Sequence, residues 1–515
     1  MNRDMIRMKR LLILLPLMAS VAAAAEPPQK PKLVVSIIVD QFRYDYLTRF
    51  KTDYNGGLRR LLTQGAVFTN AHYEHFPTVT AVGHSVFLTG AMPSVSGIIN
   101  NDWYDRSAGK RVTSVSDDAV KMVGGTGGSG ASPHRLLVST LGDELKAATG
   151  GKSRVIGISL KDRAAILPPG HAADAAFWFD SKTGTFVSST YYLPDLPAWV
   201  KEFNLKALEK FKGAEWVGGK LPSDEKLYSA ILASPFGNEL LESFAERAVQ
   251  AENLGKSGAS DLLTVSFSSN DYVGHEVGPD APAVRAMCLT TDRLLDRFFK
   301  FLDATAGMNK TLVVLTADHG VAPLPEANIA RRIPAGRMPE KIIQNTVQGE
   351  LAKRYGDGKW ILSSSEHSLY LNQELVRARS LDNREVEESA REAALGIPHV
   401  FRVYTRTQLL NGNVPNDRIG NRVMNGFNQI RGADIYILLE PFWMSGARGT
   451  THGTPFNYDS HVPILFMGPG IRTGIFDDNV MVNDIAPTLA TMLEIELPNG
   501  ADGRVLREIL VRDQK

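Results

Sequence analysis

A threonine in a proline-containing loop has the surroundings expected of a nucleophile. Thr80 lies in the stretch 75–85, where this loop runs into an apolar segment that ends at Gly90. The pattern predicts a helix with Thr80 at its N-terminus, where free N–H groups and the helix dipole favour a bound anion. A threonine hydroxyl attacks poorly near neutral pH unless a base or a metal ion activates it. From this stretch alone, Thr80 and the nearby Thr78 are also explained as helix-capping residues.

Acidic residues and histidines near predicted strand ends supply the chemistry that Thr80 lacks. A buried strand predicted at 33–39 ends in Asp40, and the strand predicted at 312–316 is followed by Asp318 and His319. Ligands of an open parallel sheet gather beyond the carboxyl ends of its strands. The full set is Asp40, Asp271, His275, Asp318, His319 and His461. Each residue alone is also compatible with a helix cap, a solvated turn or a packed histidine, but the mixed carboxylate and imidazole set suits zinc.

Two cations follow another predicted strand, at 154–160. If the extended geometry continues beyond it, Lys161 and Arg163 point to the same side, because side chains alternate along a strand. Together they would hold the oxygens of an oxyanion, with the guanidinium of Arg163 suited to bidentate contact. The alternative is a cluster of surface charges at a strand end.

The elements that must position these residues indicate an α/β fold. Apolar, β-branched runs alternate with amphipathic stretches, which is typical of a mainly parallel sheet flanked by helices. The predicted strands are 33–39, 154–160, 262–267, 312–316 and 462–467, and the predicted helices include 133–148, 238–251, 283–302 and 484–493. The sequence therefore predicts an α/β fold whose core is a mainly parallel sheet covered by helices on both faces.

The pattern of predicted helices and strands changes between residues 323 and 440. Helices predicted at 339–355 and 384–395 mix there with short alternating strands, and no set of residues resembles a site. We expect an inserted α+β subdomain at 323–440, so that the catalytic core consists of 26–322 and 441–515.

The first 25 residues have the organisation of an export signal. Four basic residues lie within the first ten positions, an apolar run follows at 11–18, and Ala23 and Ala25 fit a cleavage site. The uncharged stretch is shorter than the ~20 residues of a spanning helix, so an uncleaved anchor is the weaker alternative. We expect a protein that is exported to the periplasm or secreted after cleavage near Ala25, without a stable membrane anchor.

Composition excludes some classes of partner and crosslink. The 515 residues are 43% hydrophobic and 22% charged with a formal net charge of +1, which is ordinary for a globular protein and gives no basic surface for nucleic acid. Cys288 is the only cysteine, so an intramolecular disulfide is impossible and stability must come from the core and any bound metal ions. Cys288 falls on an apolar helix face and is predicted to pack in the core.

Seven short motifs, taken in their order along the chain, resemble those of the alkaline phosphatase superfamily. The closest likeness is to the monomeric, exported, threonine-dependent phosphomonoesterases of the PafA type, and it covers nearly all of the chain after residue 25. The motifs are Ile38-Val39-Asp40, Phe76-Pro77-Thr78-Val79-Thr80, Gly97-Ile98-Ile99-Asn100-Asn101, Lys161-Asp162-Arg163, Asp271 with His275, Asp318-His319 and Ser460-His461-Val462-Pro463. Each motif is weak alone, but seven in this order are specific.

The resemblance implies a role for each candidate residue. It makes Thr80 the nucleophile and Asn101, 21 positions later, a substrate contact, with Thr78 and Asn100 as the alternatives. It further implies substrate contacts from Lys161 and Arg163 and two zinc ions per chain. One zinc would be held by Asp271, His275 and His461, and the other by Asp40, Asp318, His319 and the Thr80 oxygen. His452 is an alternative ligand or a neighbour of the metal site.

The implied activity is hydrolysis of small phosphate monoesters through a phosphothreonine. Two zinc ions balance the three carboxylates and a Thr80 alkoxide, so Lys161 and Arg163 remain to match the two negative charges of a monoester. A diester carries one negative charge and would leave a cation unmatched. The alternatives are a nucleotide pyrophosphatase/phosphodiesterase of the same superfamily and an exported metal- or phosphate-binding protein without turnover.

Overall fold

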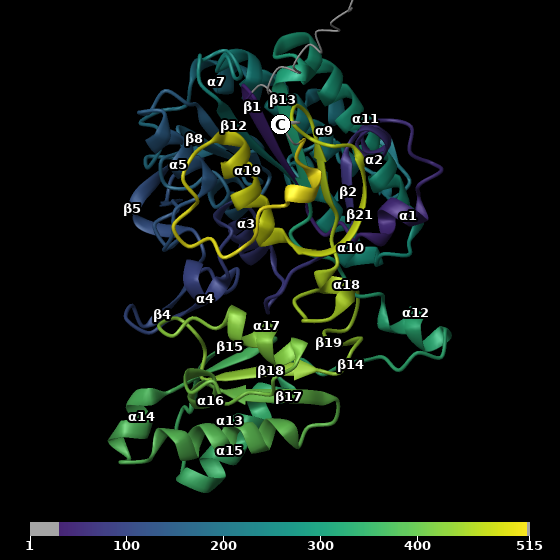
Figure 1. Cartoon of the computed structure of the whole chain (residues 1–515). Coiled ribbons are helices and arrows are strands. Elements are labelled where there is room, and N and C mark those ends of the chain that lie inside the picture. The colour runs from purple at the N-terminus through teal and green to yellow at the C-terminus, as the bar shows by residue number, and fades with distance from the viewer. Residues whose placement is uncertain (1–29, 512–515) are drawn as a thin grey trace, which may run out of the picture.

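The computed structural model describes residues 30–511, and the predicted export signal at 1–25 lies outside them. Figure 1 shows a large core above a smaller unit built mainly from residues between 325 and 445. Within 30–511, no helix is long and apolar enough to cross a membrane.

The core is organised around an eleven-stranded sheet. Its order is β21 (Gly474–Met481), β2 (Ala66–His72), β20 (Ile464–Met467), β13 (Thr311–Thr316), β1 (Leu33–Val39), β12 (Asp261–Phe267), β7 (Val155–Ser159), β8 (Ala175–Asp180), β9 (Thr185–Ser189), β5 (Ser116–Val123) and β6 (Ser129–Ala131). The central strands β13, β1, β12, β7 and β8 are parallel, whereas β20 and β9 run antiparallel to their neighbours. The predicted α/β class is confirmed.

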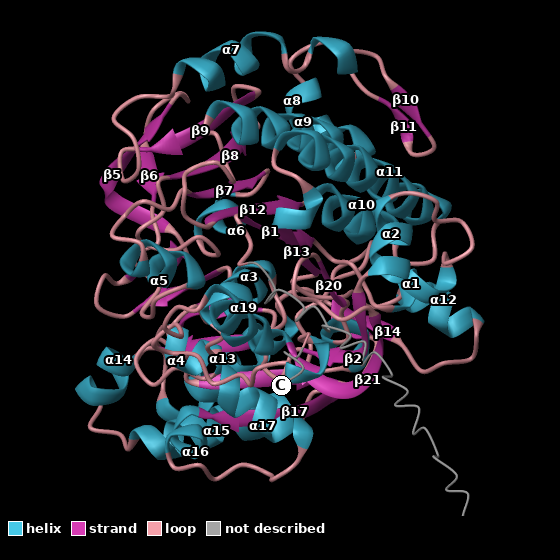
Figure 2. Cartoon of the chain, turned by 45° about the horizontal axis from the view of Figure 1, so that its top comes forward, coloured by secondary structure: helices cyan, strands magenta, loops and turns pink. Residues whose placement is uncertain are grey.

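Helices cover both faces of this sheet, which is why every residue of β1 is buried. Figure 2 shows one helical layer on each side. One layer contains α2 (Gly57–Gln64), α9 (Pro235–Ala251), α10 (Ser269–Val277) and α11 (Pro282–Thr305); the other contains α3 (Thr80–Thr89), α5 (Leu141–Ala148), α6 (Asp162–Ile166) and α19 (Ile485–Leu493). Cys288 of α11 is buried in the core, as predicted.

The smaller unit has its own four-stranded antiparallel sheet and its own apolar core. The strands are β15 (Ile361–Ser365), β16 (Ser368–Leu371), β18 (Ile435–Leu439) and β17 (Val400–Thr405), and the main helices are α13 (Ile342–Tyr355) and α15 (Asn383–Leu395). We call residues 325–445, from α12 (Pro325–Ala330) to β19 (Trp443–Ser445), the inserted subdomain. The domain boundaries given by the sequence at 323 and 440 stay a prediction.

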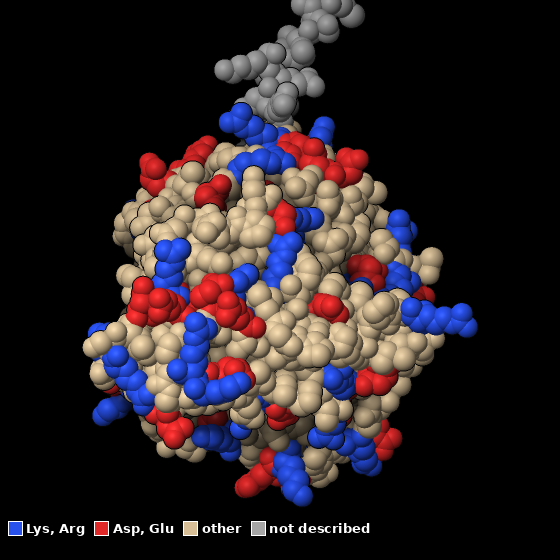
Figure 3. Space-filling view, turned by 90° about the horizontal axis from the view of Figure 1, so that it is seen from below, with Lys and Arg blue, Asp and Glu red and all other residues tan. Residues whose placement is uncertain are grey.

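Two further elements of this region matter for the site. Helix α17 (Arg418–Gly426) lies on the side of the inserted subdomain that faces the core (Figure 1). On the core side, the hairpin of β3 (Asp102–Asp105) and β4 (Lys110–Thr113) reaches toward the inserted sheet. Viewed from below, the molecule carries acidic and basic side chains interspersed (Figure 3).

One predicted helix begins later than the sequence indicated. The prediction of helix at 133–148 is wrong for its first half, because α5 begins at Leu141. Thr140 and Asp143 form a reciprocal capping box, which satisfies free N–H groups at the helix start more completely than Ser132-Pro133 does. Ser132 instead donates to Asp117.

Candidate active site

Three parallel strands end at one edge of the sheet and bring the predicted acids and histidines together. Asp40 follows β1, while Asp318 and His319 follow β13. The Nε2 atom of His319 lies 3.5 Å from Asp40 Oδ1 and 3.4 Å from Asp318 Oδ2. Helix α10, which follows β12, places His275 Nε2 3.1 Å from Asp271 Oδ1. Five of the six predicted metal ligands therefore share one site.

Thr80 lies at this edge as the first residue of α3. Its Oγ1 atom is 3.5 Å from His319 Nε2. The helix begins at Thr80 after an extended Val79 and ends before a left-handed Gly90, as predicted. Gly83 allows the close approach, since a Cβ at this position would lie 2.2 Å from the carbonyl oxygen of Asp318.

The donor atoms fall into two overlapping sets, each within 4.8 Å of one another. One set is Asp40, Asp271 and His319, and the other is Asp271, His275 and His452. The His319 and His452 rings are nearly parallel, with centroids 3.5 Å apart. Carboxylate and imidazole donors in this mixture suit zinc.

All three histidines are oriented by backbone carbonyls in the same way. Nδ1 lies 2.7 Å from Thr450 O in His275, 2.9 Å from Gly320 O in His319 and 2.9 Å from Thr78 O in His452. An Nδ1–H that donates to a carbonyl leaves the Nε2 lone pair free, and each Nε2 faces a site carboxylate. This is how metal-binding histidines are commonly held.

The structure does not bring His461 to either donor set, and the expectation that it binds metal must be corrected. Its Nε2 lies 3.0 Å from Thr69 O, and its ring stacks between those of Tyr44 and His72 with centroids 4.5 and 4.6 Å apart. A bridge between His461 and His72 ties this residue to the end of β2. His452, which the sequence presents only as an alternative, lies beside Asp271 and His275 instead.

The site buries three carboxylates with too little compensating charge. Lys161 Nζ lies 2.6 Å from Asp40 Oδ2 and 2.7 Å from Asp271 Oδ2. Asp40 Oδ1 and Asp318 Oδ2 are buried without a hydrogen-bond partner among residues 30–511. Unpaired buried carboxylate oxygens are costly, so these atoms fit a bound cation.

The pKa values of these groups reflect the same imbalance. Burial raises the pKa of Asp318 to about 6, and burial together with the charge of Asp318 raises the pKa of Asp40. Burial also opposes ionisation of Asp271, but Lys161 and His275 outweigh it and hold its pKa below the usual range. For Lys161, burial is outweighed by Asp271 and Asp40, so its pKa is raised.

Lys161 and Arg163 do not continue the strand, so the geometric expectation for them is wrong. The chain turns into α6 directly after Lys161, which stays extended at the helix N-cap, while Arg163 lies in the first turn. Lys161 enters the carboxylate cluster. Arg163 is partly exposed, and its Nε is buried without a hydrogen-bond partner in the described part of the chain.

Asn101 rather than Asn100 lies beside the start of α3. Asn101 Oδ1 accepts a hydrogen bond of 2.8 Å from the N–H of Ala81, the residue after Thr80. Asn100 Oδ1 instead accepts from the N–H of Asn101. The alternative nucleophile Thr78 donates its hydroxyl to Thr454 O at 2.8 Å, which leaves Thr80 as the threonine hydroxyl beside the donor sets.

Two further residues support the carboxylates and the start of α3. Gln41 donates from its backbone to Asp318 Oδ1 at 3.1 Å and from Nε2 to Asp271 Oδ1 at 2.8 Å, which ties two site carboxylates to one residue. His84 Nδ1 lies 2.8 Å from Thr80 O and 3.3 Å from Asp318 Oδ2. Its position one helical turn after Thr80 was the available signal, whereas nothing in the sequence marks Gln41.

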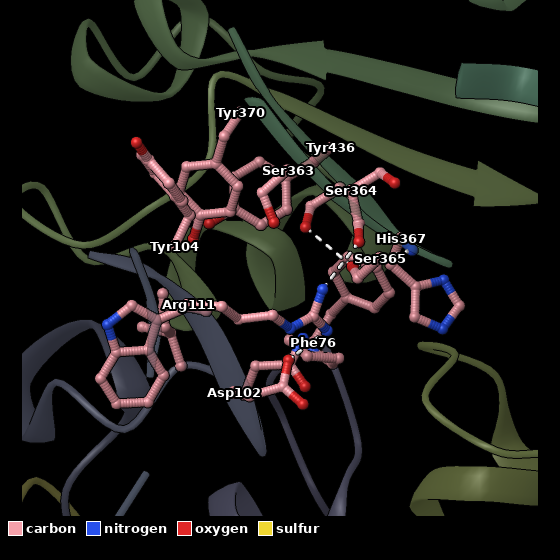
Figure 4. A pocket seen from close by; sticks show the side chains of 15 residues that line it. Phe76, Asp102, Tyr104, Arg111, Ser363, Ser364, Ser365, His367, Tyr370 and Tyr436 are labelled. Atoms are coloured by element: carbon pink, nitrogen blue, oxygen red, sulfur yellow. Dashed lines mark hydrogen bonds and ion pairs between the residues drawn. The ribbon is translucent and has the colours of Figure 1, made fainter. Parts of the chain in front are cut away.

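A small pocket lies beside this site, between residues 76–77 of the loop before α3 and the inserted sheet (Figure 4). Phe76 and Asn100 line it from the core and His367 lines it from the inserted subdomain. Arg111 crosses it, paired with Asp102 and donating to Ser364 O at 3.0 Å. Neither Thr80 nor the site carboxylates of Asp40, Asp271 and Asp318 line this pocket. The reaction is therefore assigned to the donor sets.

Known proteins resemble the chain over nearly its whole length. A family model described as type I phosphodiesterase / nucleotide pyrophosphatase matches residues 34–454. Alkaline phosphatase PafA of Elizabethkingia meningoseptica is 37% identical over 521 residues, covering 94% of this chain and 95% of that protein. A protein of Myroides odoratus named calcium-transporting ATPase is 36% identical, with coverage of 95% and 96%.

A solved structure agrees with these sequence relationships. The crystal structure of wild-type alkaline phosphatase PafA matches with a TM-score of 0.87 at 36% identity, covering 94% of this chain and 99% of that chain. With the threonine and the two donor sets at one sheet edge, these similarities show that the chain belongs to the alkaline phosphatase superfamily, as an enzyme of the PafA-like alkaline phosphatase type.

Proposed function

We propose that the enzyme hydrolyses small phosphate monoesters through a phosphothreonine formed on Thr80 at a two-zinc site. The observation that carries the proposal is the position of Thr80 Oγ1, 3.5 Å from Nε2 of His319, which belongs to the donor set of Asp40 and Asp271. A hydroxyl in this position is buried beside metal-binding groups and at the positive end of a helix.

The residues that would hold the metal ions differ in one place from the sequence-based assignment. We assign Asp271, His275 and His452 to one ion, and Asp40, Asp318 and His319 with the Thr80 oxygen to the other. A zinc pair bound there would lower the pKa of the threonine hydroxyl, stabilise charge on the leaving oxygen and activate water.

The protein groups then have separate tasks. The Thr80 oxygen forms a bond to phosphorus as the bond to the substrate alkoxide breaks, and the alkoxide leaves with a proton as an alcohol. Water next attacks the phosphothreonine, releases phosphate and restores the hydroxyl. Asn101, held against the start of α3, and the cations Lys161 and Arg163 would orient the phosphoryl oxygens.

Charge supports monoesters as the preferred substrates. Two doubly charged ions balance Asp40, Asp271, Asp318 and an ionised Thr80, so the charges of Lys161 and Arg163 remain for a dianionic substrate. Diester hydrolysis is the second candidate, because the matching family model is described by phosphodiesterase and pyrophosphatase activity. We further propose that the enzyme is exported through residues 1–25 and acts as a monomer.

The test compares two threonine variants of one helix. Thr80→Ala should abolish hydrolysis of p-nitrophenyl phosphate, whereas Thr89→Ala, which removes a buried hydroxyl at the far end of α3, should retain it. Wild type should hold roughly two zinc ions per chain and prefer the monoester to bis(p-nitrophenyl) phosphate. ATP belongs in the same panel, because the similar Myroides protein is named an ATPase.

The outcomes separate the candidate functions. Full activity of Thr80→Ala would remove the assigned nucleophile, and a preference for the diester would favour the phosphodiesterase. A wild-type protein that binds zinc and phosphate but never turns over would be a binding protein.

A further inference from the structure

One helix of the inserted subdomain is docked on the loop that carries the nucleophile. Residues 418, 422, 425 and 426 lie on one face of α17. This face meets residues 74–76. Phe76 donates its N–H to Arg422 O at 3.0 Å, and Asn425 Nδ2 donates to Glu74 O at 2.6 Å. Gly426 packs against the Phe76 carbonyl so closely that a Cβ there would lie 1.6 Å from the oxygen.

The Arg422 side chain also joins this loop to the loop that carries His452. Its Nε and Nη2 donate to the Glu74 carboxylate at 3.0 and 2.9 Å, and its Nη1 donates to the carbonyl of Pro455. The guanidinium is buried, with only 1% of the residue exposed. One planar cation therefore joins two core loops that are about 380 residues apart in the sequence.

The two loops also contact each other directly. Thr78 O lies 2.9 Å from His452 Nδ1, and the Thr78 hydroxyl donates to Thr454 O at 2.8 Å. The relative position of the loops therefore sets both the start of α3 at Thr80 and the orientation of the His452 ring.

A second residue of the inserted subdomain contacts both loops. His367, in the turn between β15 and β16, packs edge-on against the Phe76 ring with centroids 5.3 Å apart. Its Nε2 lies 2.8 Å from the place that a Cβ on Gly453 would take, so the ring occupies the space above the residue that follows His452.

We propose that Arg422, supported by His367, is a positioning residue through which the inserted subdomain holds the nucleophile loop against the His452 loop. The proposal rests on the roles proposed above for Thr80 and His452. Arg422 contacts the loops and not the donor atoms, and His367 reaches the backbone of His452, so both act through the loops that they hold.

An ion pair is well suited to hold the two loops in a defined relative position. A buried ion pair contributes little net stability compared with apolar packing, but its geometry is specific. The planar guanidinium of Arg422 donates hydrogen bonds in two fixed directions, toward Glu74 and toward Pro455. Lysine and apolar side chains cannot do this. Misplacing a reacting group by about 1 Å costs on the order of 100-fold in rate, so a small shift of either loop is measurable.

The first experiment compares Arg422 with an arginine whose ion pair is remote from the site. Arg297 of α11 donates to the buried Glu242 of α9 at 2.7 Å, so Arg297→Met removes an arginine–glutamate pair elsewhere, from an arginine that is half exposed. Arg422→Met should lower kcat/KM for p-nitrophenyl phosphate by roughly 10- to 100-fold, mainly through kcat, and should speed the loss of zinc to a chelator. Arg297→Met should lower only the melting temperature, and Arg422→Lys should fall between wild type and Arg422→Met.

The double variant Glu74→Gln/Arg422→Met distinguishes the effect of a displaced loop on catalysis from the effect of a poorly paired buried charge on stability. It removes the Glu74 charge, which in Arg422→Met keeps only the half-exposed Arg418 as its cation, so its melting temperature should recover relative to Arg422→Met while kcat stays low. Equal kcat/KM and zinc release in wild type, Arg422→Met and Arg297→Met would overturn the proposal.

The second experiment leaves all charges in place. Gly426→Ala must displace the Phe76 carbonyl, whereas Gly349→Ala in α13 meets nothing within 4 Å. Both substitutions are in helices of the inserted subdomain, where alanine is otherwise favoured. We expect a roughly 10-fold or larger loss of kcat for Gly426→Ala and wild-type kinetics for Gly349→Ala; wild-type kinetics in both would reject the proposal even if Arg422→Met cannot be purified.

The two proposals fail in different ways. If Thr80→Ala keeps wild-type activity, the proposed function is wrong. If Thr80→Ala is inactive while the Arg422 and Gly426 variants match their controls, only the positioning role is wrong.

Discussion

The Nδ1 atom of His452 lies 2.9 Å from the carbonyl oxygen of Thr78, two residues before Thr80. The loop that presents the hydroxyl thus also orients a residue of the second donor set. This coupling means that the proposed nucleophile Thr80 and His452 belong to one structural unit, although they lie far apart in the sequence.

Substitution of the two C-terminal histidines distinguishes the structural assignment from the sequence-based one. His452→Ala should lose at least one zinc ion per chain and 100-fold or more of kcat/KM, because it removes a donor beside Asp271 and His275. His461→Ala removes the stacking on Tyr44 and His72 and the contact with Thr69 O, and should keep both the zinc content and kcat. Metal analysis and kinetics of both purified variants check this; the reverse pattern would restore His461 as the ligand.

Removal of metal should reduce stability as well as activity. Without bound cations, Asp40, Asp271 and Asp318 are buried with Lys161 as the nearby ammonium, so their repulsion is only partly relieved. Dialysis against a chelator should abolish monoester hydrolysis and lower the melting temperature by several degrees, and added zinc should restore both. Asp40→Asn should raise the melting temperature of the metal-free protein, and a decrease would contradict this account.

The Glu74–arginine pair should make stability depend on acid pH. Burial opposes ionisation of Glu74, but hydrogen bonds from Arg422 and Arg418 outweigh it and lower its pKa to about 2. A carboxyl with a lowered pKa stabilises the fold above its ordinary pKa of about 4.5, and this contribution is lost as pH falls toward 2. Glu74→Gln should therefore cost about 3 kcal/mol at pH 7 and almost nothing near pH 2.

Denaturant unfolding of metal-free wild type and Glu74→Gln between pH 7 and pH 2 measures this difference. The metal-free forms are compared so that zinc release in acid does not contribute. A difference that stayed constant down to pH 2 would show that the ion pair is not its source.

Asp292 should stabilise the fold without affecting catalysis. From α11, its carboxylate accepts hydrogen bonds of 2.8 to 3.2 Å from the N–H groups of residues 55, 56, 58 and 59, at the start of α2. Asp292→Ala leaves these donors unpaired, those of Gly56 and Leu58 in a buried setting, and should cost roughly 2–4 kcal/mol of unfolding free energy. Denaturant unfolding and kinetics check this, and a change in kcat would indicate an unexpected link to the site.

Much of the architecture was predictable from the sequence because burial on both faces leaves an unambiguous apolar run. The strand expected at 33–39 is β1, and the threonine expected at a helix start is the first residue of α3. Asp40, Asp318 and His319 were found in the same way, since parallel strands must end at a common edge.

Other features were decided only by the tertiary structure. His452 and His461 are nine positions apart, and the sequence favoured His461 as the ligand, but the bridge to His72 holds His461 away while Thr78 holds His452 in place. The turn into α6 after Lys161 and the docking of α17 on Glu74 likewise depend on distant contacts. Local patterns determined which elements form and which strand ends carry polar groups. Which of these groups meet depends on packing between segments hundreds of residues apart, and no local pattern encodes that.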